Sequence, residues 1–145
     1  MKKLFLFLAV VIGVLTASAK NNYSRDVNIL PAEAQTILKD NFKSKVSHIK
    51  IGKDFGHIRE YDVVMTDGSE ISFDKHGNWK EVEVAPSSAV PSDLIPNPII
   101  TFVSENQSKA KVTSIEKKNY GYEVELSNGK DVRFTEKGKF IRYDE

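Results

Sequence analysis

The chain has 145 residues, no cysteine and a formal net charge of +1 at pH 7. Without cysteine it forms neither disulfides nor thiolate metal sites, and it cannot carry a lipid anchor on a cysteine. Acidic and basic residues are mixed along the sequence, which is not typical of nucleic-acid-binding proteins, so we expect no nucleic-acid partner. The length is that of one ordinary domain.

The N-terminus has the pattern of a secretory signal peptide. Two lysines precede the apolar run Leu4–Leu15, and Ala17-Ser18-Ala19 has the small residues of a cleavage site. The run is shorter than the ~20 residues that a membrane-spanning helix needs. We therefore predict a signal peptide over residues 1–19, cleavage after Ala19, and a periplasmic or secreted mature protein without a transmembrane anchor.

The first predicted helix begins near Pro31, because proline suits the first turn of a helix. Its apolar residues have the spacing of one helical face and are Ala34, Ile37, Leu38 and Phe42. Four strand candidates follow, where apolar residues cluster or alternate with polar ones. They are Val46–Ile51, Tyr61–Met65, the segment with Ile71 and Phe73, and a strand that opens with Trp79.

Dipeptides that contain glycine separate these strands. Asp67-Gly68 is a preferred pair for a type I′ turn, in which both central residues have positive φ, and it predicts a hairpin. His76-Gly77 marks the next turn, and Gly52–Arg59 is predicted to form the exposed tip of a longer hairpin. This first round of elements is therefore a helix followed by four strands.

Residues 85–93 are predicted to be a linker, because prolines and small residues dominate this segment. A second round follows, in which Asn97 is predicted to cap a helix and Pro98 to occupy its first position. Four strands are predicted again, with turns at Asn128-Gly129 and Lys137-Gly138. The landmarks of these strands are Val112–Lys117, Tyr122, Val132 with Phe134, and Phe140.

The two rounds align without gaps over part of their length. Tyr61–Trp79 matches Tyr122–Phe140 at a constant offset of 61 residues, with aromatic residues at both ends and glycines at the same internal positions. We interpret this match as a duplication, with residues 20–84 as the first unit and residues 94–145 as the second. A unit of this size buries little core alone. We therefore predict an α+β fold in which both units share one continuous antiparallel sheet, with both helices on one face.

The duplicated pattern is Leu-Pro, a short helix, Val-x-x-Ile, Tyr-x-Val-x-Leu/Met, Asp/Asn-Gly, Phe, Gly and Trp/Phe. It resembles the PepSY-like family of Bacteroidetes envelope proteins, which is similar in fold to the beta-lactamase inhibitor protein. The resemblance extends over Leu30–Val84 and Ile95–Tyr143. It implies an antiparallel sheet with a concave surface that contacts a protein partner, and inhibition of an enzyme is one form that such contact takes.

Catalytic chemistry is not indicated by the sequence. There is no cysteine, and no serine lies in a Gly-x-Ser-x-Gly nucleophile elbow, so we predict that the protein is not an enzyme. His48, His57 and His76 are too far apart in sequence for the short spacing of a zinc site.

Calcium is the one ion for which the sequence offers candidate ligands, and we predict no other cofactor. Carboxylate and amide oxygens, which calcium prefers, occur near two of the predicted turns, at Asp67, Glu70, Asp74 and Asn78. Their spacing is not that of an EF-hand loop, and aspartate and asparagine are also common in turns for backbone reasons alone.

A contact surface for a protein partner is predicted on the side of the sheet away from the helices. Strand alternation places polar residues and one valine on this side, namely Asp62, Val64, Glu70, Ser72, Glu123, Glu125, Asp131 and Arg133. Phe55 and His57 in the long hairpin and Tyr120 in its shorter counterpart depart from the repeat and are candidate anchors. The alternatives are a solvated face without a partner, a small-ligand or calcium-binding periplasmic protein, and a structural role in the envelope.

The aromatic residues at equivalent positions of the two units are predicted to be core. They are Tyr61, Phe73, Trp79, Tyr122, Phe134 and Phe140.

Overall fold

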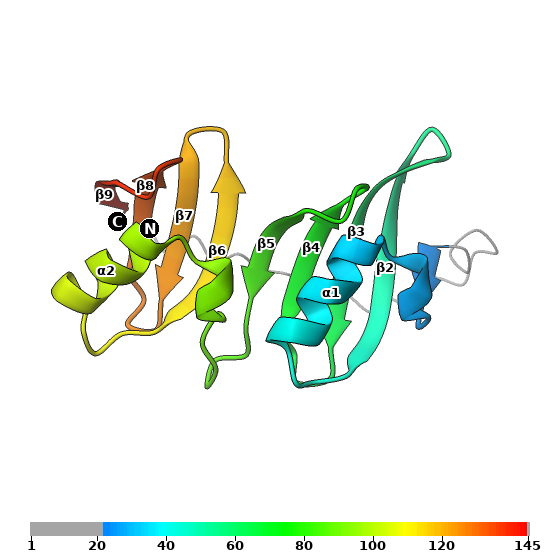
Figure 1. Ribbon diagram of the computed structural model, residues 1–145, viewed down its shortest axis with the longest axis horizontal. Helices are drawn as coiled ribbons and strands as arrows, with labels where there is room; N and C mark the ends of the chain where they lie inside the picture. The colour runs from blue at the N-terminus through cyan, green and yellow to red at the C-terminus, as the bar shows by residue number, and fades with distance from the viewer. Residues whose placement is uncertain (1–21, 145) are drawn as a thin grey trace.

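A computed structural model describes residues 22–144, and the predicted signal peptide and cleavage site lie outside these residues. Within them a nine-stranded antiparallel sheet runs in chain order from β1 to β9 (Figure 1). The strands are β1 (Tyr23–Ser24), β2 (Val46–Asp54), β3 (His57–Met65), β4 (Glu70–Asp74), β5 (Trp79–Glu83), β6 (Val112–Lys118), β7 (Gly121–Leu126), β8 (Asp131–Thr135) and β9 (Phe140–Asp144). The short strand β1 was not predicted, because two residues are too few to show an alternating pattern.

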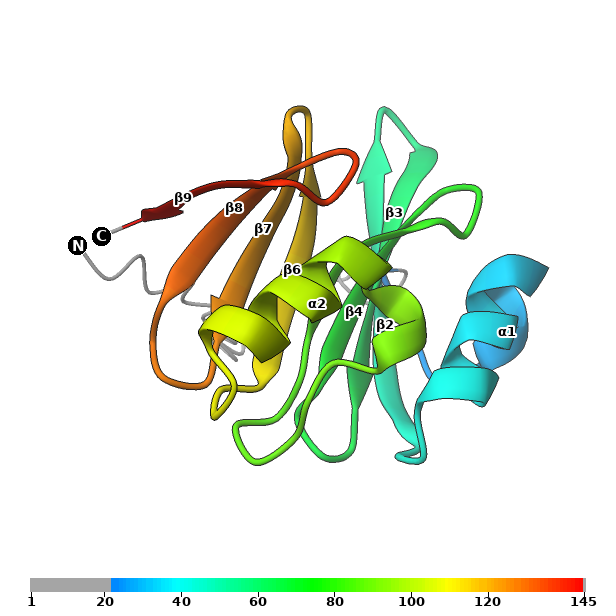
Figure 2. The same ribbon diagram turned by 60° about the vertical axis from the view of Figure 1, so that its left-hand side comes forward.

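Two α-helices, α1 (Ala32–Asn41) and α2 (Asn97–Asn106), cover one face of this sheet. Figures 1 and 2 show α1 beside the strands of the first half and α2 beside those of the second half, both on the same side. The predicted α+β fold, with one continuous sheet and both helices on one face, is confirmed. Within residues 22–144 neither helix has the length and apolar character needed to cross a membrane.

Proline fixes the start of each helix. Pro31 directly precedes α1, and Pro96 directly precedes α2, with Pro98 in its first turn. Asn97 is therefore the first residue of α2 and not its cap, one position from the prediction. A short 3₁₀ turn lies before each helix, over Val27–Ile29 and Ser92–Leu94.

The hydrophobic core lies between the helices and the sheet and joins both halves in one cluster. Each helix contributes two buried residues one turn apart, Ala34 with Leu38 and Ile99 with Val103. The strands contribute side chains that are at most 1% exposed, namely Ile49, Val63, Ile71, Phe73, Val82, Ile115, Val124, Leu126, Val132 and Phe134. Full burial of one such side chain contributes about 1.5–3 kcal/mol, so this shared core stabilises the two halves as a single unit.

The turns after β3 and β7 differ from the type I′ prediction. Gly68 N–H donates to the carbonyl of Met65, and Met65 N–H donates to that of Ser69; the second half has the same pair of bonds around Gly129. Only the glycines have positive φ, and Asp67 and Asn128 do not. Each turn is therefore a three-residue loop in which glycine takes the left-handed position. The dipeptide predicted the hairpin correctly and the turn type wrongly.

The two halves meet where β5 pairs with β6. This ladder is short and joins Glu81 to Glu116, Val82 to Ile115 and Glu83 to Ser114. The connection between the halves packs against the same strands, since Val90 is buried and its N–H donates to the carbonyl of Val112 at 2.8 Å. Residues 85–93 thus connect two halves of one sheet.

The last strand, β9, forms an open edge of the sheet, and this contradicts one core prediction. Phe140 was expected to be buried like Trp79, but it is 36% exposed, against 8% for Trp79. The reason is topological, because β6 lies beyond β5 whereas no strand in residues 22–144 lies beyond β9. Tyr61, Phe73 and Phe134 are buried as predicted.

Candidate functional site

The face of the sheet away from the helices, called the open face below, carries two rows of side chains that cross the strands. Each row consists of residues that are paired neighbours on successive strands. The first row is Lys50, Asp62, Ser72, Glu81, Glu116, Glu123, Arg133 and Arg142. The second row is His48, Val64, Glu70, Glu83, Ser114, Glu125, Asp131 and Asp144.

Carboxylates dominate the middle of both rows, and the first row has Lys50 at one end and Arg133 with Arg142 at the other. Glu81 on β5 is directly opposite Glu116 on β6, and Glu70 on β4 is directly opposite Glu83 on β5. Like charges directly opposite each other on neighbouring strands destabilise a sheet. The middle of the open face therefore carries an electrostatic cost that the fold itself does not require. We call the residues Glu70, Glu81, Glu83, Glu116 and Glu125 the acidic band.

Four members of the acidic band, Glu70, Glu81, Glu83 and Glu125, have raised pKa values. Burial, followed by the charges of Glu116 and Glu83, raises the pKa of Glu81 to about 7. Burial and then the charges of Glu70 and Glu125 raise the pKa of Glu83. Burial is also the first cause of the raised pKa values of Glu70 and Glu125. Each shift reports a negative charge that lacks sufficient water or cations around it.

Some open-face carboxylates have partners within the chain. Glu116 Oε1 forms an ion pair with Lys118 Nζ at 2.9 Å. Asp62 Oδ1 accepts a hydrogen bond from the Ser72 hydroxyl at 2.7 Å. The negative charges of the open face are therefore neutralised to different extents by partners within the chain.

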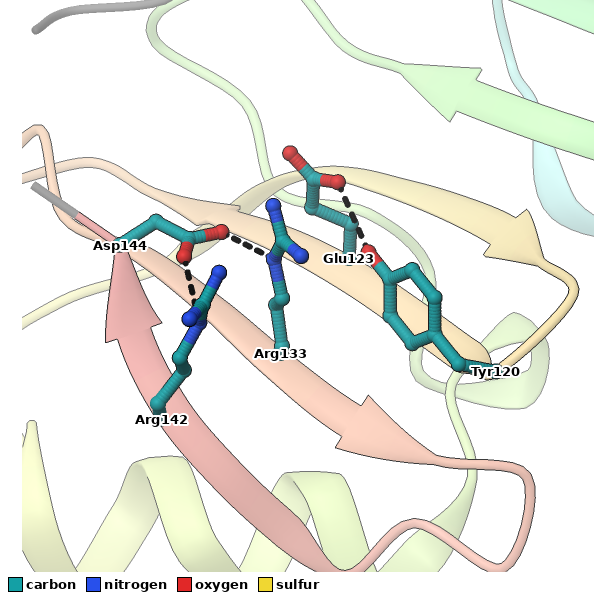
Figure 3. A network of polar contacts seen from close by, with 5 residues as sticks. All are labelled: Tyr120, Glu123, Arg133, Arg142 and Asp144. Carbon is teal, nitrogen blue, oxygen red and sulfur yellow. Dashed lines mark hydrogen bonds and ion pairs between the residues drawn. The ribbon is translucent and has the colours of Figure 1, made fainter.

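A compact polar network occupies the β7–β9 end of the open face (Figure 3). Asp144 accepts a hydrogen bond from Arg133 Nε and forms an ion pair with Arg142 Nε at 3.0 Å. The Tyr120 hydroxyl donates to Glu123 Oε2 at 3.0 Å, and the Arg133 guanidinium lies 5.3 Å from the centre of the Tyr120 ring. Positive and negative charges alternate here, in contrast to the acidic band.

Tyr120 is consequently not a free anchor at a hairpin tip. It is 37% exposed, and burial together with the hydrogen bond to Glu123 raises its pKa to about 12. The ring folds back from the β6–β7 tip onto the open face, where it contacts Arg133. Tyr120, predicted as a candidate anchor because it departs from the repeat, therefore already has contacts within the chain.

Phe55, by contrast, makes almost no contact with the rest of the chain. Its side chain is 96% exposed, and its φ of 47° places a bulky residue in the left-handed region. Such a conformation costs on the order of 1–2 kcal/mol for a residue other than glycine. Phe55 and Gly56 form the two-residue turn between Asp54 and His57.

Both long hairpins extend beyond the sheet at the same end of the strands, which is at the top in Figures 1 and 2. The β2–β3 tip presents Phe55 with the exposed His57, and the β6–β7 tip carries Tyr120. The structure therefore places the three predicted anchors at the same end of the strands. Of these, Phe55 and His57 are exposed at their tip, whereas Tyr120 lies on the open face.

A shallow cavity of about 230 Å³ lies beside the acidic band, on the side away from the two long hairpin tips. Glu83 and Glu125 line it together with hydroxyl and apolar side chains of β5–β7 and the following turns. It lies against the junction of the two halves, where neither unit alone would form it.

The four predicted calcium ligands do not come together. Asp67 lies in the turn before β4 and Asp74 at the end of β4, so about five strand residues, or roughly 17 Å, separate them. Asp67 accepts a hydrogen bond from Ser69 N–H, which lowers its pKa. At Asp74, burial raises the pKa, but hydrogen bonds from Asn78 and His76 outweigh it and lower the value. These carboxylates stabilise turns, and no group of three or more potential metal-ligating side chains occurs among residues 22–144.

All eight residues predicted on the side of the sheet away from the helices share the open face, namely Asp62, Val64, Glu70, Ser72, Glu123, Glu125, Asp131 and Arg133. Three members of the acidic band, Glu81, Glu83 and Glu116, were missed. The alternation of Glu81 and Glu83 with Val82 and Val84 would have indicated them, because it marks a half-buried strand. Their crowding depends on the β5–β6 pairing, which the alternation does not reveal.

Comparisons with known proteins agree with this architecture. A family model described as "Putative beta-lactamase-inhibitor-like, PepSY-like" matches residues 59–142. A "putative calcium-regulated periplasmic protein" of Bacteroides thetaiotaomicron is 37% identical and superimposes with a TM-score of 0.78, covering 88% of this chain and 99% of that chain.

Two structures from Bacteroides vulgatus are also similar. One, described as a putative periplasmic protein of unknown function, is 37% identical with a TM-score of 0.78, covering 85% of this chain and 98% of that chain. The other, described as a putative periplasmic protein, is 39% identical with a TM-score of 0.75, covering 83% and 94%. No curated protein matches the chain. On the family model and these relatives, the chain belongs to the PepSY-like family.

Proposed function

We propose that this protein is a non-enzymatic binding protein of the bacterial envelope that attaches to another envelope or secreted protein through its open face. The acidic band carries the proposal. Glu81 opposite Glu116 and Glu70 opposite Glu83 lower the stability of the free protein. A partner surface with lysine and arginine side chains would neutralise these charges, and complementary charge also speeds association.

Phe55 supports a second point of contact. An exposed aromatic side chain in a strained conformation costs stability and contributes nothing to the core. Aromatic residues that enter a pocket of a partner are common centres of binding energy. The Phe55 tip would therefore insert into an apolar pocket, while the open face contacts the basic surface beside it.

Inhibition of the partner is one consequence of such binding, and the description of the family as inhibitor-like supports it. A rigid antiparallel sheet that covers a basic active-site rim would block access of substrate. The fold does not identify the partner, because one fold hosts many functions. An affinity capture experiment is needed to identify it.

The test is affinity capture from the envelope fraction of the source bacterium, with residues 20–145 as bait. We expect a stoichiometric partner for the wild type and its loss for the double variant Glu83→Lys plus Glu125→Lys. The matched control is Glu33→Lys plus Glu105→Lys, which makes the same change of charge at exposed positions on the two helices. Equal capture by both double variants would contradict a role for the open face.

The Phe55 contact is tested separately with Phe55→Asn. Asparagine tolerates the left-handed conformation, so the hairpin should remain folded. We expect affinity for the captured partner to fall by about tenfold or more, as for a central aromatic contact. Unchanged affinity would show that the Phe55 tip does not contact the partner. The role of the open face would then rest on the result for Glu83→Lys plus Glu125→Lys.

A second candidate function is regulation by calcium, which the description of one relative as calcium-regulated favours. The ion would bind among open-face carboxylates such as Glu83 and Glu125, since the turn residues Asp67 and Asp74 lie too far apart. Isothermal titration with calcium at neutral pH tests this candidate. Heat that disappears in Glu83→Gln plus Glu125→Gln would support it, and a flat titration of the wild type would exclude it.

A further inference from the structure

The free edge of β9 corresponds to an edge that the first half covers. At the repeat offset of 61, Phe140 corresponds to Trp79 and Tyr143 to Val82. Val82 pairs with Ile115 of β6, whereas the outer side of β9 has no neighbouring strand in residues 22–144. Each half thus ends in the same kind of strand, and only the first has it paired on both sides.

The uncovered edge exposes apolar side chains. Phe140 is 36%, Ile141 44% and Tyr143 39% exposed, whereas Trp79 is 8% and Val82 0% exposed. Phe102 of α2 stacks on Phe140 with ring centres 4.6 Å apart, and the ring of Tyr143 lies 5.2 Å from that of Phe140. A firm aromatic cluster therefore lies beside an unpaired strand, and exposed edges of this type pair readily with other strands.

The opposite edge of the sheet is partly protected. Tyr23 and Ser24 of β1 pair with Lys50 and Ile49 of β2. β1 therefore pairs with β2 as β5 pairs with β6: Ser24 pairs with Ile49, and Val82 pairs with Ile115, the equivalent buried residue. The two edges of the sheet thus differ, and β9 is the longer free strand.

The backbone of Tyr143 is aimed outward. In the first half, Val84 N–H donates to the carbonyl of Thr113 on β6 at 3.0 Å. Because backbone groups two residues apart point to the same side of an antiparallel strand, Val82 also faces β6. Its counterpart Tyr143 therefore directs its N–H and carbonyl to the open edge, available for a pair of hydrogen bonds.

The side chains flanking Tyr143 are complementary under a twofold rotation. Arg142 precedes it and Asp144 follows it, so an antiparallel copy centred on Tyr143 sets Arg142 opposite the partner's Asp144, and the reverse. The Arg142 side chain is 60% exposed and forms an ion pair with its own Asp144 through Nε. Its remaining N–H groups can reach a second carboxylate, since a guanidinium has five donors and a carboxylate accepts several bonds.

We propose that β9 pairs antiparallel with β9 of a second copy of this chain, about a twofold axis at Tyr143, to form a homodimer with one continuous sheet. Twofold contacts of this kind are self-complementary and are the commonest in homo-oligomers. The helices of both copies would lie on one face, and the two open faces would join into one surface on the other. The proposal concerns the edge alone and does not depend on partner binding by the acidic band.

Sedimentation equilibrium of residues 20–145, which include every element described, tests the proposal. We expect a monomer–dimer equilibrium for the wild type. Arg142→Glu makes positions 142 and 144 both acidic, and Asp144→Arg makes them both basic, so each variant alone should dimerise at least about tenfold more weakly. An equimolar mixture of the two should recover the dimer, because each charge then meets its opposite across the axis.

Circular dichroism establishes that each variant is folded, and this matters because Asp144 also accepts a hydrogen bond from Arg133. Tyr143→Pro provides an independent variant, since it removes the outward N–H but leaves the bonds of β9 to β8. It should abolish the dimer, whereas Tyr23→Pro at the other edge should not. A wild type that is monomeric at its highest soluble concentration, or a mixture that stays monomeric while both variants are folded, would overturn the proposal.

Discussion

The half built from α1 and β2–β5 and the half built from α2 and β6–β9 contain the same elements, but only the first half continues into another strand. Trp79 and Phe140 occupy equivalent positions, and the first is buried while the second is 36% exposed. Lys117 of β6 also lies over Trp79, with its Nζ 3.9 Å from the ring centre. The environment of an aromatic residue is therefore decided by the neighbouring strand and not by the repeat itself.

The hairpin tips differ in a similar way. Phe55 projects freely at a left-handed position, whereas Tyr120 folds onto the open face and bonds to Glu123. One tip costs stability and the other contributes to it. The two corresponding hairpins thus differ, since the first tip projects freely and the second is a fixed part of the open face.

The largest expected effect compares the two equivalent aromatic residues. Trp79→Ala removes a buried side chain and should lower the free energy of unfolding by about 3–5 kcal/mol. Phe140→Ala removes a partly exposed one and should cost only about 1–2 kcal/mol. Urea denaturation of both variants measures the difference. Phe73→Ala and Phe134→Ala are the control pair, because both side chains are 0% exposed and should cost similar amounts.

Ionisation at the junction of the halves gives an intermediate effect. The pKa of Glu81 is raised from 4.5 to about 7 in the folded protein. Between these values the folded state keeps a proton that the unfolded state has lost, so stability falls as the pH rises. Because Glu81 is only half-buried, we expect about 1–2 kcal/mol of this dependence. Thermal unfolding across this pH range should show a steeper fall in the wild type than in Glu81→Gln, in which Glu70, Glu83 and Glu125 still contribute.

Glu123→Gln is the control for that measurement, since it removes an open-face carboxylate outside the acidic band. It should leave the slope of stability against pH nearly as in the wild type. An unchanged slope in Glu81→Gln would place the ionisation elsewhere in the band.

The smallest effects have opposite signs at the two hairpin tips. Phe55→Asn should raise the free energy of unfolding by about 0.5–1 kcal/mol, because asparagine fits the left-handed position better. Tyr120→Phe should lower it by about 0.5–1.5 kcal/mol, because the hydrogen bond to Glu123 is lost. Chemical denaturation in the same buffer compares them. Destabilisation by Phe55→Asn would mean that the Phe55 ring contributes to the fold.

Much of the fold was predictable because it depends on local patterns. Alternation within Tyr61–Met65, proline before the helices and glycine in the turns predicted the elements in their correct order. The turn type at Asp67-Gly68 was mispredicted, because a dipeptide preference does not determine how many residues the loop contains. The open face was predicted in part. Asp62 and Glu123 lie within strongly alternating strands, whereas the crowding of Glu81 against Glu116 depends on which strands pair.

The sequence by itself determined the α+β class and the order of the elements, because hydrophobic periodicity and turn residues act over a few positions along the chain. The resemblance of the duplicated pattern to the PepSY-like family indicated the family that the comparisons then showed. The tertiary structure alone decided the acidic band, the exposure of Phe140 and the separation of Asp67 from Asp74. Each of these depends on which strands are neighbours or on where a strand ends. Charge repulsion and burial act between residues distant in sequence, and only the folded sheet determines those distances.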